Sequence, residues 1–149
     1  MIYLLDTDIL IFLMRGLKAV RRPRQRSQAE TVVEKCQEAM ADGDRAGISA
    51  VTLSELEYGA WRSGQYETEI DAVHKVLVPF EFFDYDAIHC VANYGKVRHA
   101  LELRGAQIGG MDTMIAAHAL ALQATLVTNN TVHFSRVSGL TVVNWLESC

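Results

Sequence analysis

The sequence of 149 residues lacks the features that mark several common protein classes. No apolar run approaches the roughly 18 residues that a membrane-spanning helix needs, and no charged segment precedes an apolar one as in a secretory leader. Its three cysteines are an odd number without metal-type pairing, which argues against a disulfide framework. We therefore expect a cytoplasmic protein that has no membrane partner.

An excess of positive charge is also missing, since 14 Lys and Arg residues face 18 Asp and Glu residues and the formal net charge is -4. This balance argues against a protein that holds nucleic acid by bulk electrostatics, although it leaves room for a local basic patch. The chain has no internal repeat and no low-complexity segment. With half of its residues hydrophobic, it is long enough to form one compact domain over residues 1–149.

What the sequence does contain is an alternation of short apolar segments with helical patterns. The expected strands cover about residues 2–5, 46–49, 80–83, 125–128 and 140–143, and the expected helices about 9–15, 27–41, 52–62, 67–76, 84 or 86–103, and 112–122. The connections are long enough for right-handed crossovers between parallel strands. The pattern therefore predicts an α/β fold, an open parallel sheet with helices on both faces.

Several acidic residues stand at the ends of these expected elements. Asp6 directly follows the first apolar strand, where an ionised carboxylate is costly unless a hydrogen-bond donor or a cation meets it. Asp8 can cap the helix that follows. Glu55 completes a Thr52-x-x-Glu55 capping box, and Asp112 can be the N-cap of its own helix. Each acid other than Asp6 therefore has an ordinary structural explanation when it is taken alone.

The combination of Asp6, Glu55 and Asp112 is harder to explain by capping. The carboxyl ends of parallel strands meet at one edge of a sheet, so the predicted fold brings the three carboxylates to one rim. Carboxylates at such short distances repel one another unless a proton or a divalent cation neutralises them. Oxygen ligands suit Mg²⁺ or Mn²⁺. Such a cation can activate water and stabilise an attacked phosphodiester, so the acids predict metal-dependent phosphodiester hydrolysis.

Four stretches of the chain, which together extend over nearly its whole length, resemble one family. They are residues 5–10 (LDTDIL), 48–60 (ISAVTLSELEYGA), 105–118 (GAQIGGMDTMIAAH) and 126–140 (LVTNNTVHFSRVSGL). In this order and spacing they resemble the PIN-domain ribonucleases, and specifically the VapC toxins of bacterial toxin-antitoxin pairs. Each stretch alone is a weak signal, but the four together are specific.

The resemblance implies a single PIN domain, a three-layer α/β/α fold with a five-stranded parallel sheet in the order 3-2-1-4-5. It also implies a Mg²⁺-dependent endoribonuclease toxin, in which Asp6, Glu55 and Asp112 hold Mg²⁺ or Mn²⁺ and a metal-activated water cleaves RNA, with tRNA a common substrate. Many PIN domains carry a fourth acid after the fourth strand. Here Asn130 stands at that catalytic position, which leaves one-metal and two-metal mechanisms open.

The resemblance further implies a homodimer that is held inactive by a VapB-type antitoxin. The antitoxin is expected to lie along the acidic groove and to present a basic side chain to Asp6.

Five basic residues between Lys18 and Arg26 surround Pro23, which predicts a loop after a first helix that ends at Gly16. This basic loop is either a solvated surface segment or a contact for RNA phosphates. The five histidines show no ligand spacing, so we expect structural or surface roles for them.

Two other functions remain open at this point. Asp6-Thr7-Asp8 after an apolar strand is also typical of haloacid-dehalogenase-like phosphohydrolases, in which Asp6 would be a covalent nucleophile. Against this, Asp112 has no neighbouring acid and no suitable lysine lies close by in the sequence. The missing fourth acid keeps a third possibility open, a PIN-like scaffold that binds without catalysis.

Overall fold

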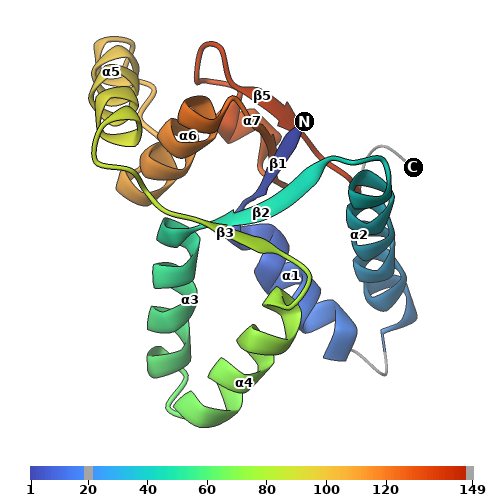
Figure 1. The fold of residues 1–149 in the computed structure, drawn as a ribbon. Helices are drawn as coiled ribbons and strands as arrows, with labels where there is room; N and C mark the ends of the chain where they lie inside the picture. Colours follow the sequence, from blue (N-terminus) through green and yellow to red (C-terminus); the bar gives the residue numbers. More distant parts are fainter. Residues whose placement is uncertain (19–21, 147–149) are drawn as a thin grey trace.

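A computed structural model describes residues 1–18 and 22–146 and shows a five-stranded sheet between two layers of helices (Figure 1). All neighbouring strands are parallel, in the order β3-β2-β1-β4-β5. The strands are β1 (Ile2–Leu5), β2 (Arg45–Ser49), β3 (Glu81–Phe83), β4 (Thr125–Val127) and β5 (Thr141–Val143). The predicted fold class and strand order are therefore confirmed.

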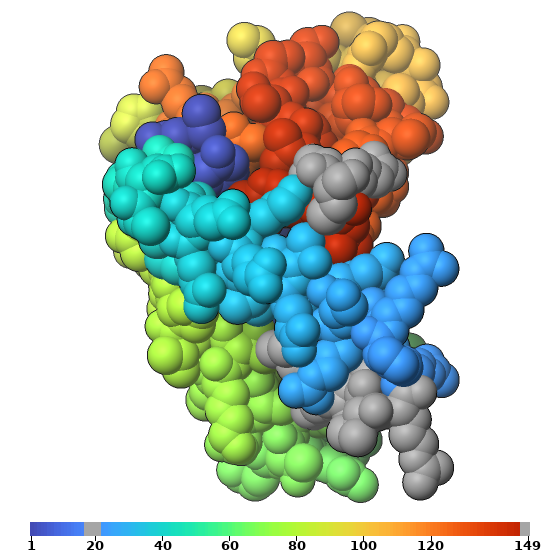
Figure 2. Space-filling model, turned by 90° about the vertical axis from the view of Figure 1, so that its right-hand side faces the viewer, coloured from blue at the N-terminus to red at the C-terminus, as the bar shows by residue number. Residues whose placement is uncertain are grey.

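Helices cover both faces of this sheet, as Figure 1 shows. They are α1 (Thr7–Lys18), α2 (Pro23–Ala41), α3 (Ala50–Arg62), α4 (Tyr66–Leu77), α5 (His89–Leu103), α6 (Gly110–Leu122) and the short α7 (Thr131–Phe134). Helices α1, α2 and α4 pack on one face, and α5 and α6 pack on the other. Figure 2 looks onto the side that α2 covers, with α4 below it. In the described part of the chain, no helix combines the length and apolar character needed to cross a membrane.

The first strand explains how one short sequence supports two cores. Its side chains alternate between the faces of the sheet, so Leu5 packs with Ile9 and Val32 beneath α1 and α2. Leu4 points the other way and packs with Ile115 beneath α6. Both leucines are fully buried, which is the pattern of a parallel strand covered on both faces. The strand that precedes Asp6 is thus rigidly held from above and below.

The first helix is longer than the sequence pattern indicated. We expected Gly16 to end it, and this prediction is wrong, because α1 continues to Lys18. A Cβ atom on Gly16 would lie 2.5 Å from the Cβ of Ala29, so the glycine instead allows α1 and α2 to cross closely. Its function is packing between helices, which the local sequence does not reveal.

The prediction of a basic loop between Lys18 and Arg26 is also largely wrong for the residues that the structure describes. Pro23 begins α2, in the first turn, where its missing N–H leaves no hydrogen bond unmade. Arg24 and Arg26 therefore lie on the first turn of a helix, and Arg26 pairs with Glu30 at 3.2 Å. Residues 19–21 lie outside the described part of the chain.

Two helix starts near the acidic residues also differ from the expectation. The capping box predicted from Thr52 and Glu55 is not formed, because Ser49 is the N-cap of α3 and its Oγ accepts from the amide of Val51. Helix α6 begins at Gly110, so Asp112 lies inside its first turn and not at the cap. Both carboxylates are therefore free of the capping role that explained them in isolation.

Candidate active site

Asp6 lies at the carboxyl end of β1, next to the point where the strand order reverses between β1 and β4. The register pairs Leu5 with Val127, which places Asp6 beside Thr128. Thr128 donates its hydroxyl hydrogen to Asp6 Oδ2 at 2.9 Å, and the amide of Thr7 donates to Oδ1 at 2.8 Å. Asp6 is only 4% exposed, so these donors fix both of its oxygens in a buried position.

Asp8 shares this position, although the sequence indicated a cap for it. Thr128 Oγ1 lies 3.3 Å from Asp8 Oδ2, so one hydroxyl stands between the two carboxylates. Burial, together with the charges of Asp8 and Asp112, raises the pKa of Asp6 to about 8. Burial also raises the pKa of Asp8. A second negative charge next to Asp6 therefore makes a nearby cation favourable.

Glu55 reaches the same rim from the second turn of α3. Its Oε1 accepts from the hydroxyl of Thr7 at 2.7 Å, and Thr7 Oγ1 also lies 3.0 Å from the hydroxyl of Thr52. Burial and the charge of Asp112 raise the pKa of Glu55, while the bond from Thr7 lowers it. Thr7 thus contacts Asp6 through its backbone and Glu55 through its side chain, and it ties the first two acids together.

Asp112 completes the set from the first turn of α6. Its Oδ2 lies 3.0 Å from Nε2 of His133, a residue of the short helix α7. Burial raises the pKa of Asp112, whereas the charge and the hydrogen bond of His133 lower it. Asp112 also acts electrostatically on both Asp6 and Glu55, so its carboxylate lies close enough to repel each of the other two.

Sequence reasoning missed His133, which we had grouped with the structural or surface histidines. The residue lies outside the helices and strands expected from the sequence, and the structure forms α7 there. Because the contact with Asp112 joins two distant segments of the chain, no local spacing could have revealed it. The one available signal was its place in the stretch 126–140 that resembles the family.

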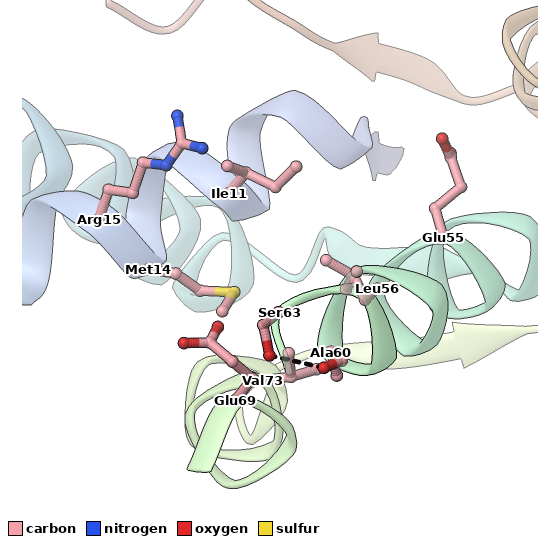
Figure 3. Close-up of a pocket in the computed structure, with 10 residues that line it drawn as sticks. Ile11, Met14, Arg15, Glu55, Leu56, Ala60, Ser63, Glu69 and Val73 are labelled. Carbon is pink, nitrogen blue, oxygen red and sulfur yellow. Dashed lines mark hydrogen bonds between the residues drawn. The ribbon is translucent and has the colours of Figure 1, made fainter. Parts of the chain in front are cut away.

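A pocket of about 480 Å³ opens beside Glu55, between α1, α3 and α4 (Figure 3). Met14 and Leu56 give it an apolar lining, and Arg15 and Glu69 add charges of opposite sign. In Figure 3 Glu55 stands at one end of this pocket, and the other labelled side chains extend away from it along α1, α3 and α4. Glu55 is therefore the site acid that borders this largely apolar pocket, which is called the groove below.

Comparison with known proteins identifies the family. The family model of the PIN domain matches residues 3–140. The chain belongs to the PIN-domain family. This PIN domain is 34% identical to the ribonuclease VapC2 of Rickettsia felis, over 97% of the chain and 98% of the relative. It is 33% identical to the tRNA(fMet)-specific endonuclease VapC of Shigella flexneri, over 96% of the chain and 97% of the relative.

Solved structures agree with this assignment to the VapC branch of the PIN-domain family. VapBC2 from Rickettsia felis, bound to a DNA fragment from its promoter, matches with a TM-score of 0.83 and 32% identity, over 97% of this chain and 99% of that chain. VapBC-1 from nontypeable Haemophilus influenzae matches with a TM-score of 0.81 and 34% identity, over 97% and 98% of the two chains. The resemblance to VapC proteins is thus confirmed, and the haloacid-dehalogenase alternative is set aside.

The donor chemistry of this PIN domain fits a divalent cation. Asp6, Glu55 and Asp112 offer only carboxylate oxygens, the ligands that Mg²⁺ and Mn²⁺ prefer. Burial raises the pKa of each carboxyl group, and the charge of Asp112 raises the pKa of Asp6 and Glu55 further. Within residues 1–18 and 22–146, no group of three acidic, histidine or cysteine side chains converges tightly enough to surround an ion. The fit therefore rests on the chemistry and electrostatics of the donors.

Asn130, the residue at the position of a fourth acid, lies on the exposed side of this rim. It is the N-cap of α7, where its amide donates to Thr128 Oγ1 at 3.0 Å and its carbonyl accepts from Phe134. Its side chain faces solvent. In the described chain, the additional carboxylate beside Asp6 comes from Asp8, two residues further on in the first turn of α1.

Proposed function

We propose that this PIN domain is a Mg²⁺- or Mn²⁺-dependent endoribonuclease toxin that acts in the cytoplasm. The observation that carries the proposal is the buried Asp6 carboxylate, whose pKa is raised to about 8 by burial and by the charges of Asp8 and Asp112. Such a cluster is unstable as a set of bare anions near neutral pH and is stabilised by a bound cation. The names of the VapC relatives, which are ribonucleases and endonucleases, support RNA cleavage.

In this proposal Asp6, Glu55 and Asp112 hold the cation. A divalent cation there supplies the positive charge that lowers the pKa of the attacking water and neutralises the phosphodiester under attack. Thr128 and the Thr7 amide hold the Asp6 carboxylate in one orientation, and the Thr7 hydroxyl orients Glu55. The donors Thr7 and Thr128 are short residues next to the ends of β1 and β4, which suits the precise placement that catalysis needs.

The relatives also suggest the substrate and partner. The name of the Shigella flexneri relative specifies tRNA(fMet), so tRNA is the first RNA to test. The matched VapBC structures support a VapB-type antitoxin as the inhibitor of a homodimeric toxin. The groove beside Glu55 fits an apolar antitoxin segment, while the acids fit a basic side chain that replaces the charge of the cation.

The test measures cleavage of a total tRNA pool and of single tRNAs by purified protein during titration with Mn²⁺ or Mg²⁺. Wild-type protein should cleave only with the metal, and Asp6→Asn and Asp112→Asn should lose cleavage. Asp42→Asn is the matched control, because Asp42 is an exposed residue at the end of α2 and should leave cleavage unchanged. Cleavage that survives both site substitutions, or that needs no metal, would contradict the proposal. RNA binding without cleavage would favour the scaffold function.

A further inference from the structure

One short segment of the chain contacts two of the acids at once. Thr128, at the start of the segment, donates to Asp6 Oδ2 at 2.9 Å. His133, near its end, lies 3.0 Å from Asp112 Oδ2. Residues 128–133 therefore span the rim from the β1 acid to the α6 acid and determine how the two carboxylates are held relative to each other.

The imidazole of His133 is fixed by more than Asp112. Its Nε2 also lies 2.8 Å from the carbonyl oxygen of Ile108, in the segment that leads into α6. A carbonyl oxygen can only accept, so Nε2 carries a hydrogen and is the donor to both oxygens. The next residue, Phe134, is fully buried and anchors α7 in the core beneath α6. The position of the donor is thus determined by the packed core.

We propose that His133 is a positioning residue, which fixes the Asp112 carboxylate for cation binding through the Nε2 hydrogen bond to Oδ2. This inference rests on the proposed metal-dependent function. A bond to one oxygen fixes the rotation of the whole carboxylate group, and with it the direction in which the other oxygen, Oδ1, presents its lone pairs. Hydrogen bonds that orient metal ligands in this way commonly change metal affinity by 10-fold to 100-fold when removed.

The role differs from that of the hydroxyl groups around Asp6. Thr128 and Thr7 hold an acid whose backbone already lies at a strand end, beside another strand. Asp112 stands on a helix whose N-cap, Gly109, has φ of 94° and offers no side chain to hold it. The side chain of Asp112 is 35% exposed, so without His133 it is free to turn toward solvent. The histidine supplies the constraint that the sheet supplies for Asp6.

The experiment measures Mn²⁺ binding by isothermal titration calorimetry and by electron paramagnetic resonance, in the absence of RNA. We expect His133→Ala to weaken Mn²⁺ binding by about 10-fold or more. His133→Gln, whose amide N–H reaches a similar position, should bind Mn²⁺ within about 3-fold of wild type. The matched control is His99→Ala, at an exposed histidine of α5, which should bind as wild type does. Thermal unfolding of each variant shows whether weaker binding follows from lost structure.

A double-mutant cycle separates positioning from general damage. In an Asp112→Asn background, where the carboxylate is already lost, adding His133→Ala should weaken Mn²⁺ binding no further. If the wild-type protein binds Mn²⁺ and His133→Ala binds it equally tightly, this inference is overturned and the metal-dependent function stays intact. A glutamine variant as weak as the alanine variant would also overturn it. Wild-type protein that binds no Mn²⁺ would overturn the inference and the proposed metal dependence together.

Discussion

The rim that carries Asp6 and the groove beside Glu55 are built in opposite ways. At the rim, the Asp6 carboxylate is buried and held by hydrogen bonds from Thr7 and Thr128 next to two strand ends, so its geometry is set by the sheet register. The groove lies between three helices and is lined largely by apolar side chains. This difference fits a division of function within the proposal, in which the sheet positions the reactive groups and the helices offer a surface for a partner. Glu55 belongs to both regions.

The largest expected effect comes from changing the residue that the regions share. Glu55→Gln keeps the size of the side chain but removes its charge, so cleavage should fall by about 100-fold or more as the cation loses a ligand. Affinity for a synthetic peptide of the antitoxin C-terminal segment should fall as well, since a basic side chain of the peptide loses its acceptor. Initial cleavage rates and fluorescence anisotropy measure the two effects. Cleavage that persists would remove Glu55 from the metal site.

A substitution confined to the groove should weaken peptide binding without changing cleavage at the rim. Gly59 lines the groove, and a Cβ atom there would meet nothing within 4 Å, so Gly59→Arg fills the groove without a clash inside the protein. Peptide affinity should fall by about 10-fold to 100-fold, or roughly 1.4–2.7 kcal/mol, while cleavage stays within about 2-fold. Gly95→Arg is the matched control, because Gly95 is also an exposed helical glycine with open space. Equal effects on peptide binding and cleavage would contradict the division.

Helix α1 runs from the rim to the groove, and its packing against α2 can be tested by substitution. A Cβ atom on Gly16 would lie 2.5 Å from Ala29 Cβ, so Gly16→Ala should lower the free energy of unfolding by about 1–2 kcal/mol despite the better helix propensity of alanine. Gly95→Ala, with open space around it, should be neutral or stabilising. Urea denaturation measures both. A stabilised Gly16→Ala variant would show that α1 and α2 are less closely packed than described.

The buried charge at the rim should make stability depend on pH in metal-free protein. The pKa of Asp6 is about 8 in the folded protein and 3.8 ordinarily, so the folded state binds this proton more tightly than the unfolded chain does. The stabilisation of the folded state by the bound proton of Asp6 is fully present below about pH 4 and is lost as pH rises toward 8. Relative to Asp6→Asn, wild-type protein should therefore lose stability across this range, and Mn²⁺ should restore it. Urea denaturation of both proteins at several pH values measures the difference, and parallel curves would contradict it.

The smallest expected effect concerns charges outside both regions. Arg22 and Arg24 are exposed at the start of α2, and replacing both with Ala should weaken RNA binding by about 2-fold to 5-fold at low salt. The slope of log affinity against log salt concentration should become shallower. Lys96→Ala on α5, which packs on the other face of the sheet, is the control. Unchanged binding at low salt would mean that the basic segment is only a solvated surface.

Several features could be predicted because they depend on local pattern. Apolar strands that alternate with helices determined the α/β class, and Asp6, Glu55 and Asp112 could be named from their places after strands and at helix starts. The strand order followed from the resemblance to the PIN-domain family. The metal-binding role of the three acids remains a prediction.

The contributions of other residues could not be predicted, because each depends on a partner far away in the chain. Gly16 looks like a helix stop until α2 is seen to cross it at Ala29. Asp8 looks like a cap until β4 brings Thr128 beside it.

By itself, the sequence determined which acids stand at the ends of strands and helices, since those places follow from hydrophobic period and chain order. Only the tertiary structure decided what each acid contacts. Glu55 accepts from Thr7 and not from its own helix start, and Asp112 meets His133 and not a cap amide. The physical reason is that a carboxylate takes the best donor within reach, and reach is set by strand register and helix packing between segments that are distant in sequence.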